Sequence, residues 1–236
     1  MLKTIEAYLF AFREVKEKPK LWFSIIIGFI ISGSIGQALS DDMAIIKAAL
    51  SIAEFIFYIG IANIAVKVVT NKEYTIRDIF ISPSILWRCV LILILMVILS
   101  TLASLPVSLI LIYLGAKNIT GGILVSGSAA ITMAIMIYVF MKLYFSSYYL
   151  LDKKLGVWQC LKVSWEDNTY KVCFSIFLAL IWITVLSAPV LLLDRYLNGI
   201  HLAYLLTPIQ ELAMVHLYMQ LQQKRNNDAP EQLQSQ

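Results

Sequence analysis

The chain has 236 residues, of which 60% are hydrophobic and 14% are charged, and its formal net charge is +4. Its mean hydropathy of +0.79 is too high for a soluble globular domain, in which about half of the residues are apolar. The positive charge does not indicate nucleic-acid binding, because the basic residues lie beside long apolar runs and no polar segment could form a separate binding domain. We therefore expect a membrane protein without a nucleic-acid partner.

Residues 1–20 predict a helix that lies along the membrane surface. Apolar side chains recur there at helical spacing, with Lys, Arg and Glu between them, and a proline ends the pattern. The apolar positions are Leu2, Ile5, Tyr8 or Leu9, and Phe12.

Six apolar runs follow, each long enough to cross a hydrocarbon core of about 30 Å. They cover 21–39, 43–69, 86–114, 122 to an aromatic belt at 144–149, 172–193 and 200–221. A signal peptide is the alternative for the first run, and its long amphipathic leader favours a span. Residues 21–222 are thus predicted to form a six-helix transmembrane domain, and the polar residues 223–236 to form a disordered cytoplasmic tail.

The stretch YFSSYYLLDKKLGVWQCLKVSWEDNTYKV, residues 144–172, predicts a second surface helix. Leu155, Trp158, Leu161 and Trp165 repeat in it at helical spacing among basic residues. The predicted fold class is therefore all-α: a polytopic membrane protein of six transmembrane helices, with amphipathic interfacial helices at the N-terminus and between helices four and five.

The distribution of Lys and Arg predicts the orientation of the chain. All but three of the 19 basic residues lie on one side of the predicted topology. The exceptions are Lys47, Lys117 and Arg195. Because basic residues concentrate in cytoplasmic loops, and because the number of spans is even, we expect both termini to be cytoplasmic.

Two stretches resemble a family of bacterial six-helix membrane proteins. LLDKKLGVWQCLKVSWEDNTYKV has an aspartate at the end of a span, a glycine turn, an amphipathic helix ending in Ser-Trp and a basic approach to the next span. GIANIAVKVVTNKEYTIRDIF has a small-residue helix end, a basic loop and Asp-x-Phe. Both are similar to the YciC-like inner-membrane proteins and to the related membrane domain of some glycerophosphodiester phosphodiesterases.

This resemblance implies a six-helix fold in the bacterial cytoplasmic (inner) membrane, and a family without an agreed biochemical activity. The chain shows no phosphodiesterase domain beside its membrane part, so that activity is not implied.

Polar residues within the spans form a candidate intramembrane site. Glu54 and Glu211 both lie near the middle of their predicted spans, where a charged side chain is unfavourable by about 2.5–3.5 kcal/mol on insertion scales. Together with Gln210 and Asn63, they are interpreted as a protonatable site in a polar cavity. The alternative is that both carboxylic acids are neutral and hydrogen-bond neighbouring helices as structural contacts.

Two further sets of residues are singled out by type and position. Prolines inside spans are candidate helix kinks that either line a cavity or are ordinary in membrane helices; they are Pro106, Pro189 and Pro208. Basic residues at the cytoplasmic ends of spans either extend to the headgroups or form a contact for anionic lipid; they are Lys67, Arg88, Lys142, Lys153, Lys154 and Lys162.

No motif for catalysis, phosphate binding or metal binding is present, and Cys89, Cys160 and Cys173 lack metal-ligand spacing. We therefore expect no enzymatic activity and no cofactor. The first hypothesis is a non-enzymatic protein that organises the envelope or handles lipid. Its partners would be bilayer lipid, a membrane protein or a second copy. A small transporter or channel using Glu54 and Glu211 is the second hypothesis, and an intramembrane enzyme is the third.

Overall fold

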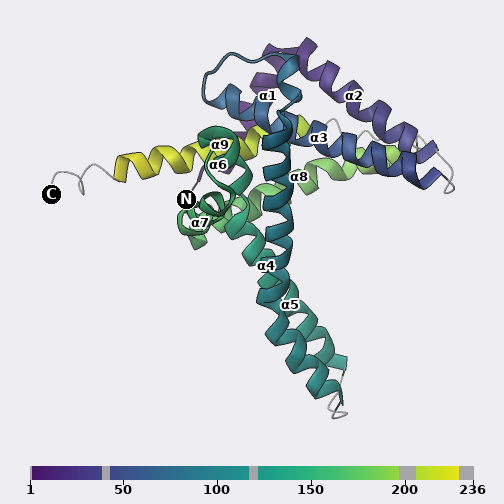
Figure 1. Ribbon diagram of the computed structural model, residues 1–236, viewed down its shortest axis with the longest axis vertical. Coiled ribbons are helices and arrows are strands. Elements are labelled where there is room, and N and C mark those ends of the chain that lie inside the picture. The colour runs from purple at the N-terminus through teal and green to yellow at the C-terminus, as the bar shows by residue number, and fades with distance from the viewer. Residues whose placement is uncertain (1, 39–42, 117–121, 197–205, 229–236) are drawn as a thin grey trace. The chain divides into compact units, whose positions relative to one another are not determined.

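The computed structural model describes residues 2–38, 43–116, 122–196 and 206–228. Every regular element within these ranges is a helix, so the predicted all-α fold is confirmed (Figure 1). The elements are α1 (Thr4–Glu17), α2 (Pro19–Ala38), α3 (Ala44–Val69), the 3-10 helix η2 (Ile76–Ile79), α4 (Pro83–Ala116), α5 (Gly122–Leu143), α6 (Ser146–Lys153), α7 (Val157–Asp167), α8 (Tyr170–Tyr196) and α9 (Thr207–Asp228).

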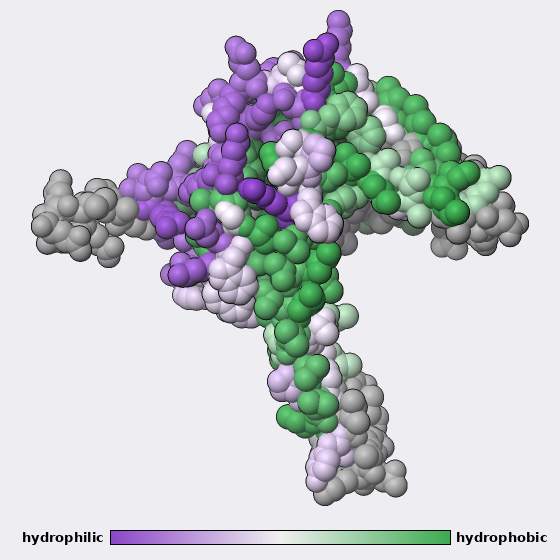
Figure 2. Space-filling view, in the orientation of Figure 1, coloured by the Kyte–Doolittle hydropathy of each residue, from purple (hydrophilic) through white to green (hydrophobic). Residues whose placement is uncertain are grey.

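Four helical segments of the described chain are long and apolar enough to cross a membrane. They are Ile45–Val69 in α3, Pro83–Ile110 in α4, Ala129–Lys153 across α5 and α6, and Tyr170–Val190 in α8. Figure 2 shows mostly hydrophobic residues along α4. By length and composition, the chain is suited to a membrane.

The predicted first and sixth spans are not among these four segments. The apolar part described in α2 is the shorter segment Pro19–Gly28. The predicted sixth span, 200–221, begins outside the described residues, and α9 starts only at Thr207. Six spans therefore stay a prediction.

The chain divides into two compact units, which are described separately. The first comprises Met1–Leu86 and Phe174–Gln236, and the second comprises Trp87–Cys173.

Helix α9 is the centre of the first unit. It packs against α1 and α3, and its side chains from Leu212 to Val215 are fully buried. On α1, the buried Ala7 and Ala11 leave room for a close approach between helices, as small residues do in helix interfaces. Tyr8 Oη also donates a hydrogen bond of 2.7 Å to the carbonyl of Ala179 in α8.

Helix α1 carries a second apolar face that the fold leaves exposed. Ile5, Leu9 and Phe12 lie one helical turn apart along it, and all three are exposed. These three belong to the predicted surface-helix stripe, whereas Leu2 of that stripe and the alternative Tyr8 are buried. The buried face of α1 consists mainly of small residues. Two apolar faces are what a helix needs if it packs on its own protein and also contacts another apolar phase.

The predicted disordered tail is partly wrong, because α9 continues through Asp228. Residues 223–228 are helical because Gln, Lys and Arg favour helix and extend one that is already formed. The rest of the predicted tail lies outside the described residues.

The second unit is built from α4, α5, α6 and α7. A turn at residues 144–145 separates α5 from α6, and α7 packs against both α6 and α5. The aromatic belt predicted at this point is wrong for Phe145, Tyr148 and Tyr149, which are buried, since the turn brings them inside the α6–α7 packing. Residues 144–172 thus contain two short helices, α6 and α7, rather than one surface helix.

Candidate functional site

Asp78 joins the turn after α3 to the end of α3. Its Oδ1 lies 2.6 Å from Lys67 Nζ, and its backbone carbonyl accepts a hydrogen bond of 2.9 Å from Asn63 Nδ2. Its Oδ2 accepts a hydrogen bond of 2.7 Å from the backbone N–H of Thr75, at the start of η2. The hydrogen bond from Lys67 holds the pKa of the Asp78 carboxyl below its usual value.

These contacts of Asp78 bear on two residues that were singled out in the sequence. Asn63 was placed in the intramembrane polar site, but its amide instead binds the η2 turn. Lys67 was a candidate lipid contact, but its charge is paired with Asp78. Sequence spacing could not show these contacts, because they form where η2 packs on α3. The two predicted roles stay predictions.

The carboxylate of Glu211 is buried between α9 and α3. Its side chain sits in the second turn of α9, the residue is only 1% exposed, and Tyr58 Oη of α3 donates a hydrogen bond to its Oε1. Tyr58 was not predicted as a partner, because nothing in the sequence shows which face of α3 meets α9.

Glu54 lies one helical turn before Tyr58 on α3, and therefore on the same face. It is half-buried and makes no hydrogen bond or ion pair with any described residue. Gln210 is half-buried beside Glu211 in the sequence of α9. Tyr58 thus hydrogen-bonds Glu211 directly and lies one helical turn from Glu54 on α3.

The three predicted kinks have different places in the helices. Pro106 and Pro189 lie inside α4 and α8, each of which continues past its proline. Pro208 is the second residue of α9 as described, and residues 197–205 before it lie outside the described residues, so its role as a kink stays a prediction.

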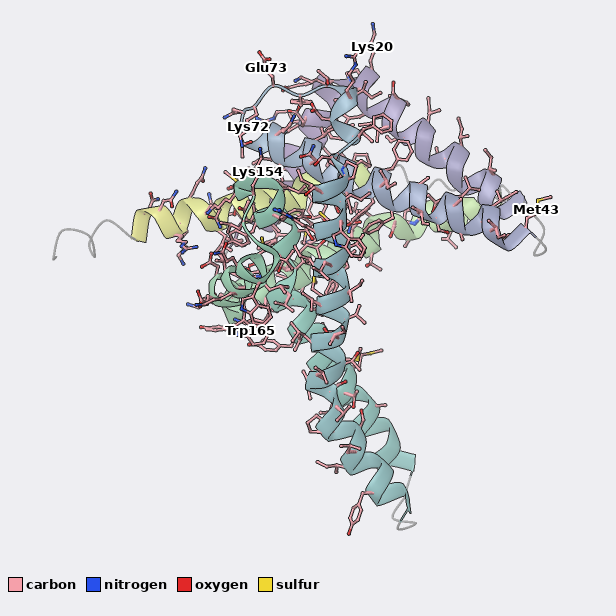
Figure 3. The ribbon with its side chains drawn as sticks, in the orientation of Figure 1. Lys20, Met43, Lys72, Glu73, Lys154 and Trp165 are labelled. Carbon is pink, nitrogen blue, oxygen red and sulfur yellow. The ribbon has the colours of Figure 1, made fainter. Side chains whose placement is uncertain are left out.

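A polar hollow of about 520 Å³ lies between α1 and the loop after α3. Lys18 Nζ is 3.9 Å above the ring of Tyr74, whose hydroxyl donates a hydrogen bond to Glu14. Lys72 and Glu73, labelled in Figure 3, also line this hollow. Positive and negative side chains are balanced here, so the hollow favours neither an anion nor a cation.

Asn168, the residue that follows α7, connects the end of that helix to the end of α5 in the second unit. It is fully buried, and its Nδ2 donates hydrogen bonds of 3.0 Å to the carbonyls of Met141 and Lys142. Ser164 Oγ donates a second bond, of 3.0 Å, to the Lys142 carbonyl. The last carbonyls of a helix lack partners within the helix, so these side chains complete the end of α5.

An apolar groove of about 590 Å³ lies where α7 crosses α4 and α5. We call it the α7 groove. We call its aliphatic lining residues the floor and its aromatic and charged lining residues the rim. The floor is Leu99, Leu102, Ala103, Val139, Leu143 and Leu161, and the rim is Trp158, Lys162, Trp165 and Glu166. The volume is within the range of about 300–1,000 Å³ typical of ligand pockets.

The rim of the α7 groove combines aromatic and charged side chains. Lys162 Nζ and Glu166 Oε1 are 3.9 Å apart, and both side chains are largely exposed. Trp165, labelled in Figure 3, has Lys142 Nζ 5.2 Å from its ring centroid. Lys142 also donates a hydrogen bond of 2.7 Å to the Asn168 carbonyl.

The other predicted lipid-contact residues of this unit do not line the groove. Arg88 and Lys154 are exposed, and Lys153 Nζ is 5.4 Å from the ring centroid of Tyr149. The groove itself was not predicted, although the apolar repeat that includes Leu161 marked the helix that closes it.

Within the described residues, no group of three or more His, Cys, Asp and Glu side chains could hold a metal ion. No family model, no curated protein and no solved structure matches this chain. The resemblance to YciC-like proteins therefore stays a prediction, and function is argued from the geometry of the two sites above.

Proposed function

We propose that this chain is a non-enzymatic protein of the bacterial inner membrane that binds lipid at its cytoplasmic face. The α7 groove carries this proposal, because it is a ligand-sized hollow with an apolar floor and a partly charged rim. An apolar floor beside a partly charged rim is complementary to a lipid, which has an apolar chain and a polar headgroup.

The position of the groove along the α4–α5 pair supports the same proposal. Helix α5 has 22 residues and is therefore about 33 Å long, close to the hydrocarbon thickness of about 30 Å. Leu143, its last residue, would then lie near one boundary of the hydrocarbon, and the groove floor includes it. A lipid chain in the groove would have its headgroup at the level of α7.

The proposed topology has six spans, interfacial helices α1 and α7, and both termini in the cytoplasm. The exposed apolar stripe of Ile5, Leu9 and Phe12 supports a membrane-surface position for α1. The exposed Trp158 and Trp165 support the same position for α7, because Trp concentrates at membrane interfaces.

Filling the groove tests the proposed function. We expect the Ala103→Trp variant, purified in mild detergent, to lose lipid that copurifies with the unaltered protein, as measured by native mass spectrometry. Ala129→Trp is the matched control, since Ala129 is exposed on α5 and does not line the groove. Equal lipid retention by both variants would refute binding in the groove. The same spectra would show a protein partner or a second copy.

Transport coupled to protons is a second candidate function, favoured by the hydrogen bond from Tyr58 to the buried Glu211. A carboxylic acid that is buried next to a hydroxyl donor can gain and lose a proton without a permanent charge in the membrane. Glu54, one turn from Tyr58, would be the next proton acceptor.

Proton flux into proteoliposomes that contain a pH-sensitive dye tests this candidate. We expect faster flux than in empty liposomes, and a loss of that difference in Glu211→Gln and Tyr58→Phe. Glu73→Gln is the control, since Glu73 is an exposed loop residue. If Glu211→Gln instead fails to accumulate in the membrane, the carboxylate is structural and the transport candidate is refuted.

A further inference from the structure

We propose that the α7 groove selects an anionic glycerophospholipid, with one acyl chain on the groove floor and the headgroup phosphate at Lys162. This inference rests on the proposed lipid-binding function and specifies the ligand class of that site.

The floor of the groove is complementary to an acyl chain, because it offers only apolar side chains. The six floor residues are aliphatic, and they come from α4, α5 and α7. A headgroup phosphate could not lie on this floor, because a charged group without polar partners in an apolar site is strongly unfavourable. The ligand must therefore place its polar end at the rim.

The rim itself carries one ammonium group, from Lys162, and one carboxylate, from Glu166. Lys142 does not line the groove, but its ammonium lies 5.2 Å from the ring centroid of the rim residue Trp165 and adds a second positive charge beside the rim. Lys142 donates a hydrogen bond to the Asn168 carbonyl and lies beside the Trp165 ring, and neither contact neutralises its charge. Asp167 is the next acidic residue, but it accepts a hydrogen bond from Tyr149 and does not line the groove.

The contact between Lys162 and Glu166 is loose enough to be opened by a ligand. Its separation of 3.9 Å is longer than a hydrogen bond, and the two side chains are 67% and 58% exposed. Exposed pairs of this kind contribute little to stability. A phosphate at the rim could therefore draw Lys162 away from Glu166 at small cost.

Helix α7 is held in a fixed position, which a selective rim requires. Asn168 and Ser164 bind the end of α5, and Tyr149 of α6 donates a hydrogen bond to Asp167 at the end of α7. Trp165 is positioned beside Lys142 by the same packing. A rim fixed in this way can distinguish headgroups by charge, whereas a freely moving surface helix would only attract anionic lipid in general.

Opposite changes at Lys162 and Glu166 test the inference. The full-length protein in mild detergent is titrated with dioleoyl phosphatidylglycerol, dioleoyl phosphatidylcholine or dioleoyl phosphatidylethanolamine, and bound lipid is measured by native mass spectrometry. We expect phosphatidylglycerol to bind more tightly than either zwitterionic lipid. Lys162→Gln should weaken its binding about fivefold, since one basic residue near a membrane surface contributes about 1 kcal/mol, and Glu166→Gln should strengthen it.

Two outcomes would overturn the inference. Equal binding of all three lipids would remove charge selection, while loss of that binding in Ala103→Trp would still support the proposed lipid-binding function. Tighter binding of phosphatidylethanolamine, weakened by both Lys162→Gln and Glu166→Gln, would show that the rim instead binds a zwitterionic headgroup. If no lipid binds and Ala103→Trp changes nothing, the proposed function itself fails. Circular dichroism of the two rim variants, both at exposed positions, verifies that they remain folded.

Discussion

Asp78 holds the turn after α3 with both its carboxylate and its backbone carbonyl. We expect Asp78→Asn to lower the free energy of unfolding by about 1 kcal/mol at neutral pH, because it removes the ion pair with Lys67 and weakens the cap of η2. Thermal unfolding in detergent measures this loss. Glu73→Gln, in the same loop, should change little.

The effect of Asp78→Asn should also depend on pH in a defined direction. The folded pKa of Asp78 lies below its unfolded value of about 4. The stabilisation by its carboxylate is therefore fully present above pH of about 4, and it is lost as the pH falls through the folded pKa. The stability difference between the original protein and the variant should shrink over that acidic range. A difference that instead grows on acidification would contradict the ion-pair argument.

Asn168 has a larger predicted effect because it is fully buried. Asn168→Ala should destabilise the second unit by about 2–3 kcal/mol, since the Met141 and Lys142 carbonyls lose their amide donor. Asn168→Asp should be at least as harmful, because it places an acceptor against those acceptors. Asn226→Ala, at an exposed position of α9, is the control.

Reaction of Cys160 with a maleimide gives a readout specific to this unit. Cys160 is buried on α7, and burial raises the pKa of its thiol to about 11, so labelling at neutral pH should be slow in the folded protein. Labelling should accelerate in both Asn168 variants. An unchanged rate in both would show that Asn168 does not hold α7 in place.

At the scale of elements, α3 and η2 approach so closely that only glycine fits at position 60. A Cβ added to Gly60 would lie 2.3 Å from the Ile79 carbonyl oxygen, which is backbone and has little freedom to move. Gly60→Ala should therefore destabilise the first unit by about 1–3 kcal/mol. Gly127→Ala, inside α5, meets nothing within 4 Å and should be neutral or slightly stabilising. Equal thermal stabilities of the two variants would refute this close approach.

The sequence predicted helices better than their contacts. Runs of apolar residues located α3, α4, α5 and α8, because the thickness of a bilayer fixes how long such a run must be. The bond from Tyr58 to Glu211 spans 153 positions, and that from Asn168 to Lys142 spans 26. Helical periodicity describes one helix at a time, so it could assign Glu211 to a polar site without finding Tyr58, and it gave no signal for Asn168.

The same limit explains which contacts the sequence did not reveal. The charge of Lys67 and its place at a helix end suggested a lipid contact, but the partner that neutralises this charge lies on η2. The α7 groove likewise needs side chains from α4, α5 and α7 to come together. Only the rim helix had a visible pattern in the sequence, which is why Lys162 was predicted and the apolar floor was not.

At the scale of the whole molecule, α5 links the proposed topology to the proposed site. Residues 117–121, which lie outside the described residues, precede α5 in the sequence, and the α7 groove lies at the other end of this helix, at Leu143. If α5 spans the membrane, this segment and the groove must lie on opposite sides. The bias of basic residues predicts the groove on the cytoplasmic side and the segment outside.

Cysteine labelling tests this arrangement directly. We expect Asn118→Cys to react with a membrane-impermeant maleimide added to spheroplasts, and Gln236→Cys to react only after the membrane is permeabilised. The native cysteines of the described chain are all buried, so the unaltered protein serves as the background control. Labelling of Gln236→Cys from outside would contradict a cytoplasmic C-terminus. Protection of Asn118→Cys in spheroplasts would contradict the proposed position of residues 117–121 outside and of the groove on the cytoplasmic side.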